Sequence, residues 1–209
     1  MNARRKQAPE DNGHGKRQAI LHAAFDVISE MGLYKTTVEA VAKRAQVAKG
    51  TVYLYFKSKE DLFVEMVVDR LEHAHEEVRE AISREQGTWP KLRTAIRIHF
   101  RSMLTVMSYL MVGEGLMKLG AKHIRKLVKA RQAHLEIYEK ILEEHFAKEG
   151  ETRFSPKAAA MALTGGMAGY MFQMHENRLN VPTPDEYLKT FEAIVYAALI
   201  GDAPGPNEH

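Results

Sequence analysis

Apolar residues recur at helical spacing along most of the chain, and no segment shows the alternation of polar and apolar residues that is typical of a β-strand. The pattern predicts helices over Lys16–Met31, Thr36–Gln46, Lys49–Phe56, Ser58–Arg84, Lys91–Met111, Glu114–Leu119, Ala121–Lys148, Pro156–Asn177 and Asp185–Ile200. Polar segments with glycine or proline separate most of these helices. The sequence therefore predicts an all-α protein.

The first three predicted helices have the lengths and spacing of a helix-turn-helix unit. One side of the first helix, from Ile20 to Ile28, is apolar, and Gly32 stands where a left-handed C-terminal cap is expected. Thr36 and Glu39 have the spacing of a capping box, in which each side chain satisfies a backbone N–H at a helix start. A first helix packed across two short helices is the three-helix form of this motif.

Positive charge is concentrated at the N-terminal end. The net charge is only +3, but residues 1–60 contain eleven Lys and Arg against six Asp and Glu, whereas the remainder contains nineteen against twenty-one. A basic segment favours a polyanion as partner, because neutralising phosphates releases condensed counterions. A solvated surface explains a modest excess equally well.

The segment from Ile20 to Asp69 resembles the TetR family of transcriptional regulators. The resemblance rests on the pattern Gly-x-x-Tyr-x-Tyr-Phe-x-x-Lys-x-x-Leu, which runs from Gly50 to Leu62, and on the capped helix ahead of it. It implies an N-terminal three-helix DNA-binding domain and a C-terminal helical domain for ligand binding and dimerisation. It also implies contact with double-stranded operator DNA for Thr37, Lys49, Gly50, Thr51, Tyr53, Tyr55 and Lys59.

The chemistry of these residues agrees with that assignment. Lysine donates to guanine acceptors, and the threonine hydroxyl and methyl serve a base edge, a phosphate or a thymine methyl, while Gly50 lets the backbone approach. The two tyrosine hydroxyls suit phosphate oxygens, and Lys59 lies at a helix start that favours an anion. The alternative for Tyr53 is that its side chain packs against the protein and does not contact DNA.

The turn departs from the family pattern at two positions. Gln46 stands where the family usually has glycine, and Ala48 where it often has a serine cap. We expect Gln46 to adopt a positive φ, and the helix after Ala48 to lack a cap contribution of roughly 1 kcal/mol.

Residues 1–15 are predicted to be a flexible basic arm. Arg4, Arg5 and Lys6, with Lys16 and Arg17, are candidates for phosphate or minor-groove contacts, and a solubilising tail is the equal alternative. The expected domains are then 16–60 for DNA binding, 61–200 for effector binding and dimerisation, and 201–209 as a polar tail.

Small residues are dense in the predicted helix Pro156–Asn177, which favours close approach of another helix. The resemblance implies that the last two helices pair with those of a second subunit in a homodimer. The candidate dimer residues are Ala162, Gly166, Gly169, Tyr187, Phe191, Ile194, Val195 and Ala198. Packing within one chain is the alternative for this set.

Methionine and aromatic residues form two sets in the C-terminal half. Methionine adapts to irregular apolar shapes, so these sets predict a pocket for an apolar or amphipathic small molecule, with ordinary core packing as the alternative. The candidate ligand residues are Phe100, Met103, Met107, Met111, Met117, Tyr138, Met167, Tyr170, Met171 and Met174.

Other kinds of site lack support in the sequence. The chain has no cysteine, which excludes disulfides and thiolate metal ligands and favours a reducing, cytoplasmic location. Its most apolar stretch is too short and glycine-rich for a membrane span. The ten histidines include His73 and His75, which fall on different helix faces, and we expect surface histidines and no metal or cofactor. No catalytic motif is visible, so an enzyme is not expected.

The sequence thus predicts a ligand-responsive, homodimeric DNA-binding regulator. We expect a repressor that leaves a near-palindromic operator when a small molecule changes the spacing of its recognition helices. The first alternative is an activator, or a regulator gated by a protein partner without an inducer. A helical enzyme with an incidental helix-turn-helix is the second, and it requires a convergent set of polar residues in the second domain.

Overall fold

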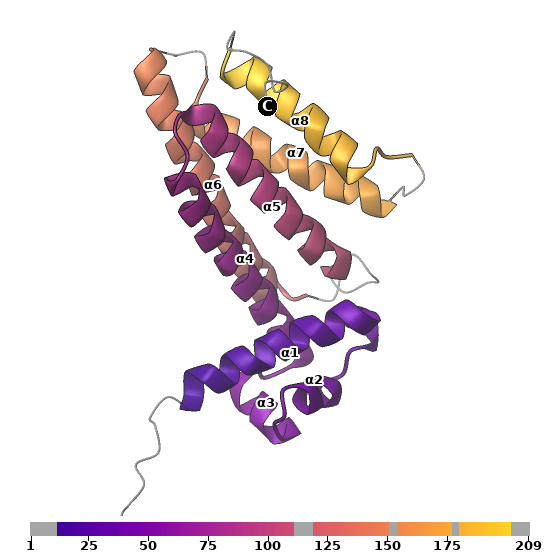
Figure 1. The fold of residues 1–209 in the computed structure, drawn as a ribbon. Helices are drawn as coiled ribbons and strands as arrows, with labels where there is room; N and C mark the ends of the chain where they lie inside the picture. The colour runs from indigo at the N-terminus through magenta and orange to yellow at the C-terminus, as the bar shows by residue number, and fades with distance from the viewer. Residues whose placement is uncertain (1–11, 111–118, 151–153, 177–179, 202–209) are drawn as a thin grey trace, which may run out of the picture. The chain divides into compact units, whose positions relative to one another are not determined.

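The computed structural model describes residues 12–110, 119–150, 154–176 and 180–201, and in these ranges the chain forms helices and no strands. The helices are α1 (Asn12–Lys35), α2 (Val38–Arg44), α3 (Lys49–Tyr55), α4 (Lys59–Ser83), α5 (Thr88–Leu110), α6 (Ala121–Glu149), α7 (Pro156–Glu176) and α8 (Pro184–Leu199) (Figure 1). The all-α prediction is confirmed. The chain divides into two compact units, Met1–Met66 and Val67–His209.

Unit 1 consists of α1, α2 and α3 together with the first residues of α4. α1 packs on α2, and α2 packs on α3. Their shared core holds the apolar residues expected from the sequence pattern, namely Ile20, Leu21, Ala24, Val27, Ile28, Val38, Val41, Ala42, Val52 and Phe56. The helix-turn-helix prediction is therefore confirmed at the level of packing.

The ends of α1 differ from the prediction. The helix begins at Asn12 rather than Lys16, inside the segment expected to be a flexible arm. It also continues through a kink at Gly32 to Lys35. Gly32 has φ 79° and ψ 156°, so its φ is positive as expected. Its ψ, however, is not that of a left-handed cap, and glycine reaches this conformation because it has no Cβ.

The capping box predicted at Thr36 is wrong by one residue. Thr37 is the N-cap of α2, and its hydroxyl accepts a hydrogen bond from the Ala40 N–H at 3.1 Å. The Thr36 hydroxyl instead donates to the Gly32 carbonyl oxygen at 2.8 Å. Thr36 and Thr37 have the same capping chemistry. At the kink, the Gly32 carbonyl oxygen accepts the hydrogen bond from Thr36, and Thr37 therefore serves as the cap.

The turn before α3 has both expected departures. Gln46 has a φ of 56°, and Ala48 has the extended backbone of an N-cap but forms no side-chain cap hydrogen bond. The next helix does have its serine cap, because Ser58 Oγ accepts from the Asp61 N–H at 3.0 Å.

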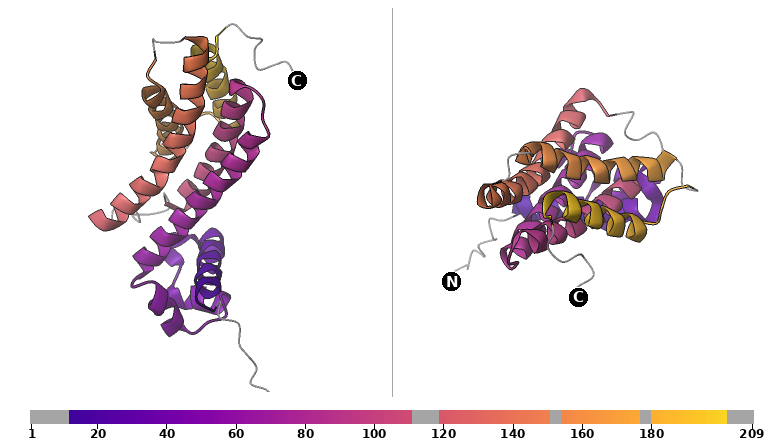
Figure 2. Two further views of the ribbon diagram at one scale, coloured as in Figure 1. Left: turned by 90° about the vertical axis from the view of Figure 1, so that its left-hand side faces the viewer. Right: turned by 90° about the horizontal axis from the view of Figure 1, so that it is seen from above.

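Unit 2 contains most of α4 and the helices α5 to α8. α5 packs against α6, α7 and α8, and α6 packs against α7; Figure 2 shows these helices from two further directions. The break between α4 and α5 falls at Gly87, so Trp89 and Pro90 lie in the first turn of α5 and not in a loop. A full capping box, missed from the sequence, joins Thr183 and Glu186 at the start of α8.

The remaining helix ends in unit 2 agree with the prediction to within a few residues. The predicted helix Glu114–Leu119 lies outside the described residues except for Leu119, which is buried. The C-terminal tail also lies outside them, apart from Gly201. Among the described residues, no helix combines the length and the apolar character needed to cross a membrane.

Candidate functional site

One side of α3 is anchored in unit 1 and the other faces solvent. Val52 is buried, and Phe56, which caps the helix, is buried as well. Lys49, Gly50 and Tyr53 are exposed, while Thr51 and Tyr55 are half-buried. A Cβ placed on Gly50 would meet no atom within 4 Å, so the backbone of the first turn is open to approach by a large partner.

Lys49 of α3 pairs with Glu39 of α2. The Lys49 ammonium donates to Glu39 Oε1 and lies 5.9 Å from the centre of the Tyr53 ring. This hydrogen bond lowers the pKa of the Glu39 carboxyl and raises the pKa of Lys49. Both side chains are exposed, so the ion pair adds little to stability and a phosphate oxygen can replace the carboxylate.

Two predicted residues lie at helix starts. The Thr37 hydroxyl caps α2 as an acceptor and also hydrogen-bonds to the Glu39 side chain. Lys59 is the first residue of α4, and its ammonium donates to the Tyr34 carbonyl oxygen at 3.3 Å. Backbone N–H groups at a helix start favour an anion, so both positions suit phosphate.

Leu54, an apolar residue on the outer side of α3, is not among the residues predicted from the sequence. Its side chain is 84% exposed. Leu54 lies one helical turn after Gly50, and this spacing is the signal that was available in the sequence. An exposed apolar side chain on a recognition helix suits contact with a thymine methyl.

Arg17, one of the arm candidates, is held within unit 1. Its guanidinium forms an ion pair with Glu65 at 2.7 Å and lies over the Phe56 ring at 5.6 Å from the ring centre. It therefore supports the residue that ends α3. Arg4, Arg5 and Lys6 lie outside the described residues.

Most of the candidate ligand residues are core residues of unit 2. Phe100, Tyr138, Met167, Tyr170 and Met171 are buried in one cluster, and Met103 and Met174 pack against it. Met111 and Met117 lie outside the described residues, as does the side chain of Met107. The structure brings the two sets together, and their contact with a ligand stays a prediction.

Among the described residues of unit 2, three histidines are buried, which corrects the expectation of surface histidines. His75 of α4, His99 of α5 and His134 of α6 are each at most 3% exposed. His75 Nε2 and His134 Nδ1 share a hydrogen bond, and the His99 and His134 rings stack at 3.6 Å. His99 Nδ1 lies 3.2 Å from the Tyr138 hydroxyl. Sequence spacing concealed this cluster because its members come from three helices.

Burial keeps the three imidazoles neutral. It lowers the pKa of His75 to about 4 and that of His99 to about 3, helped by nearby positive charge. The pKa of His134 is lowered for the same reasons, and burial raises the pKa of Tyr138. In the described residues, no group of three or more His, Cys, Asp or Glu side chains is arranged to hold a metal ion.

The candidate dimer residues divide into an inward and an outward group. A Cβ on Gly166 would lie 2.8 Å from Phe191 Cε2, so Gly166 serves helix packing within the chain. Val195 is buried, and Tyr187 and Phe191 stack in a row with Phe100 and Tyr170. These four residues pack within unit 2, and their contact with a second subunit stays a prediction.

The outward group forms an apolar surface that we call the α7–α8 face. It consists of the exposed residues Met161, Ala162, Gly169, Phe172, Ile194 and Ala198. Met161, Phe172 and Ile194 are each more than half exposed. A groove of about 500 Å³, lined in part by Ala162, Ile194 and Ala198, lies between the two helices.

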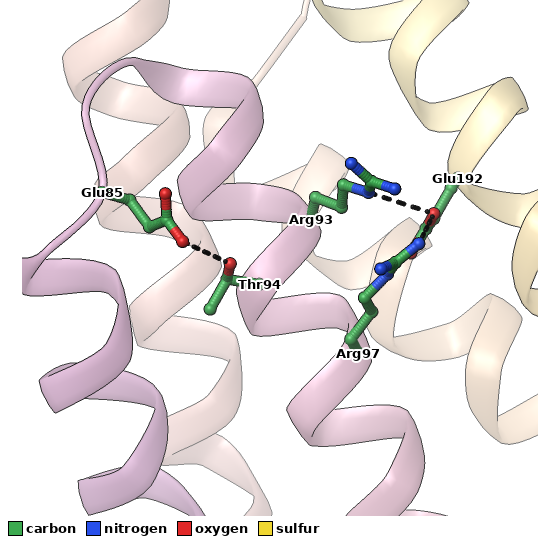
Figure 3. A network of polar contacts seen from close by, with 5 residues as sticks. All are labelled: Glu85, Arg93, Thr94, Arg97 and Glu192. Carbon is green, nitrogen blue, oxygen red and sulfur yellow. Dashed lines mark hydrogen bonds and ion pairs between the residues drawn. The ribbon is translucent and has the colours of Figure 1, made fainter. Parts of the chain in front are cut away.

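A second groove, the arginine groove, lies between α5 and α8 and has a volume of about 760 Å³. Glu192 of α8 lines this groove, is buried, and accepts two hydrogen bonds from Arg97 of α5, at 2.6 and 3.0 Å (Figure 3). Arg93 Nε forms a longer ion pair with the same carboxylate at 3.5 Å. The hydrogen bonds that Arg97 donates to Glu192 raise the pKa of Arg97.

Comparison with known proteins agrees with the class of fold. Residues 20–66 match the family described as bacterial regulatory proteins, tetR family. The fatty acid metabolism regulator protein of Bacillus subtilis is 38% identical over 85 residues, which are 41% of this chain and 44% of that protein. The uncharacterised HTH-type transcriptional regulator YvdT of the same organism is 37% identical over 78 residues, 37% of this chain and 40% of the relative. The matched segment thus spans less than half the length of these relatives.

A solved structure extends the likeness of the fold to unit 2. The transcriptional regulator FadR from Bacillus subtilis, solved in complex with stearoyl-CoA, superposes with a TM-score of 0.68 at 23% identity, covering 89% of this chain and 99% of that one. Unit 1 is a helix-turn-helix domain. Within it, residues 20–66 are similar to the DNA-binding segment of the tetR family.

The histidine cluster predicts that unit 2 loses stability in mild acid. Below pH 6.5 the unfolded chain protonates these imidazoles, whereas the folded cluster stays neutral down to the lowered pKa values, so protons favour unfolding. At pH 5.5 each group removes up to about 1.4 kcal/mol relative to pH 7.5, or roughly 4 kcal/mol for three. Urea unfolding followed by the fluorescence of Trp89, the single tryptophan, measures this difference.

Matched variants identify the source of the pH effect. His75→Gln should reduce the difference between pH 7.5 and pH 5.5 by about a third, because one of three buried imidazoles is gone. His22→Gln, which changes an exposed histidine of α1, should leave the difference unchanged. Equal stability of the unaltered protein at both pH values would contradict a neutral buried cluster.

Proposed function

We propose that this chain is a transcriptional regulator that reads operator DNA with α3. The exposed outer side of α3, anchored from behind by Val52 and Phe56, is the observation that carries the proposal. A recognition helix must present donors and small residues at its first turn so that base edges are within reach. Lys49, Gly50 and Thr51 meet that requirement.

The contacts of the site divide into two kinds. Thr51, and Lys49 once released from Glu39, read base edges in the major groove. Thr37, Tyr53, Tyr55 and Lys59 bind phosphate oxygens and fix the position of the helix on the duplex. The basic excess of residues 1–60 adds the sequence-independent attraction to DNA.

The regulator acts as a repressor whose effector is an amphipathic small molecule of the acyl-CoA type. The names of two similar proteins support this class: one regulates fatty acid metabolism, and the other was solved with stearoyl-CoA. α4 starts in unit 1 and continues into unit 2, so one continuous helix belongs to both. An effector that favours a different spacing of the two recognition helices lowers operator affinity without touching a base contact.

A homodimer completes the proposal, with the α7–α8 face as its interface. Met161, Phe172 and Ile194 are large apolar side chains that these two helices expose, and an apolar groove lies between the helices. Exposed apolar surface of this kind marks interaction sites. The small residues Ala162, Gly169 and Ala198 allow a second pair of helices to approach closely. Two subunits related by a two-fold axis match a near-palindromic operator.

The two kinds of contact respond differently to salt. Lys59→Ala removes one phosphate contact per subunit, so the slope of log affinity against log salt should become shallower by roughly 2, for operator and random DNA alike. Thr51→Ala should leave the slope unchanged and weaken operator binding by about 1–3 kcal/mol per half-site, with little effect on random DNA. Fluorescence anisotropy at several salt concentrations measures both quantities.

Two results of this experiment would move the base-reading surface away from α3. One is an equal loss of operator and random DNA binding in Thr51→Ala. The other is an unchanged salt slope in Lys59→Ala. Lys43→Ala, an exposed lysine on α2 outside the proposed site, serves as the control for a general loss of charge.

If the α7–α8 face is the dimer interface, a charge placed on it should prevent dimerisation. Ile194→Glu places a charge on the α7–α8 face, where Ile194 is 60% exposed. Because burying an unpaired carboxylate is strongly unfavourable, light scattering at micromolar concentration should give a dimer mass for the unaltered protein and a monomer mass for the variant. Ile124→Glu, at an exposed isoleucine of α6, should remain dimeric. A monomeric unaltered protein would refute this interface.

A further inference from the structure

The arginine groove combines positive charge with an apolar wall. Its charged lining comprises Arg93, Arg97, Arg101, Lys189, Asp185 and Glu192, an excess of two positive charges. Phe100, Leu104 and Leu188 are among its apolar residues. At about 760 Å³ the groove falls within the size range of small-molecule sites.

Glu192 orients a cation in this groove. The buried carboxylate engages two donors of the Arg97 guanidinium. A guanidinium carries five N–H donors, and the Arg97 side chain is 51% exposed. The pair therefore holds the guanidinium in one orientation, with donors left for a further acceptor.

Arg101 and Lys189 also line this groove. Arg101 pairs with Glu77 of α4, and both side chains are more than half exposed. Such a pair is worth little in water, so an anionic ligand can displace Glu77 at small cost. Lys189 is exposed on α8 and adds a second exposed cation to the groove.

The apolar side of the groove leads toward the core. Phe100 lines the groove and is also the first ring in the row formed with Tyr187 and Phe191. Leu104 follows Phe100 by one helical turn on α5. The apolar chain of an amphipathic ligand could lie along these residues while its charged headgroup contacts the nearby cations of the groove.

We propose that the arginine groove binds the anionic headgroup, phosphate or carboxylate, of an amphipathic effector whose chain lies along Phe100 and Leu104. The inference rests on the proposed function, because it places the effector of unit 2. Arg97, Arg101 and Lys189 bind the anion, and Glu192 is the positioning residue for Arg97.

The test compares three probes by isothermal titration calorimetry: stearoyl-CoA, stearate and free CoA. The variant Arg101→Gln with Lys189→Gln leaves the buried Glu192 pairing intact. It should bind stearoyl-CoA at least about tenfold more weakly than the unaltered protein and with a shallower salt dependence, because two charge-assisted contacts are lost. Arg84→Gln with Lys148→Gln, which alters two exposed cations of unit 2 outside the groove, should bind as the unaltered protein does.

The three probes identify the anion. A loss for stearoyl-CoA and free CoA alone assigns the groove to phosphate, and a loss for stearate as well assigns it to a carboxylate. Lys189→Gln alone, with an expected loss of a few-fold, replaces the double variant if thermal melting shows that the latter is unfolded.

Two results would overturn the inference. Equal affinities of the groove variant and the unaltered protein would place the effector elsewhere in unit 2 and leave the proposed function standing. Absence of binding by all three probes would overturn the groove together with the acyl-CoA type of effector. Operator binding, measured on the same preparation, shows separately whether the DNA-binding part of the proposed function holds.

Discussion

A seven-residue helix does not keep its shape in water by itself, and α3 depends on its packing against the rest of unit 1. Val52 and Phe56 supply that packing, and Arg17 covers Phe56 while it pairs with Glu65. Because one side of the helix is fixed in this way, the opposite side must face solvent. The exposure of Lys49, Gly50, Tyr53 and Leu54 therefore follows from the core behind them.

Features that depend on neighbours in the sequence were predictable. Helical spacing of apolar residues gave the helices and the core of unit 1, and the turn chemistry gave the positive φ of Gln46 and the missing cap at Ala48. The cap of α2 was misplaced because Thr36 and Thr37 are chemically alike. Only the kink at Gly32, which draws the Thr36 hydroxyl back onto α1, distinguishes them.

Features that depend on distant residues were not predictable from one sequence. The histidine cluster joins α4, α5 and α6, and the Arg97–Glu192 pair joins positions far apart along the chain. The same limit explains Gly166: a small residue permits close approach, but the sequence does not say whether the neighbour is Phe191 of the same chain or a second subunit. Which residue packs against a given helix face depends on the three-dimensional fold and not on the spacing of residues along the sequence.

The most direct measurement is selection of genomic DNA fragments by the purified protein, followed by sequencing. If α3 reads an operator from a symmetric dimer, the enriched fragments share an inverted repeat. Its half-sites should lie about one helical turn, ~34–36 Å, or a multiple of it apart, because both recognition helices must enter the major groove on one side of the duplex. Enrichment without a common sequence, or of a single unrepeated site, would contradict a dimeric operator-binding regulator.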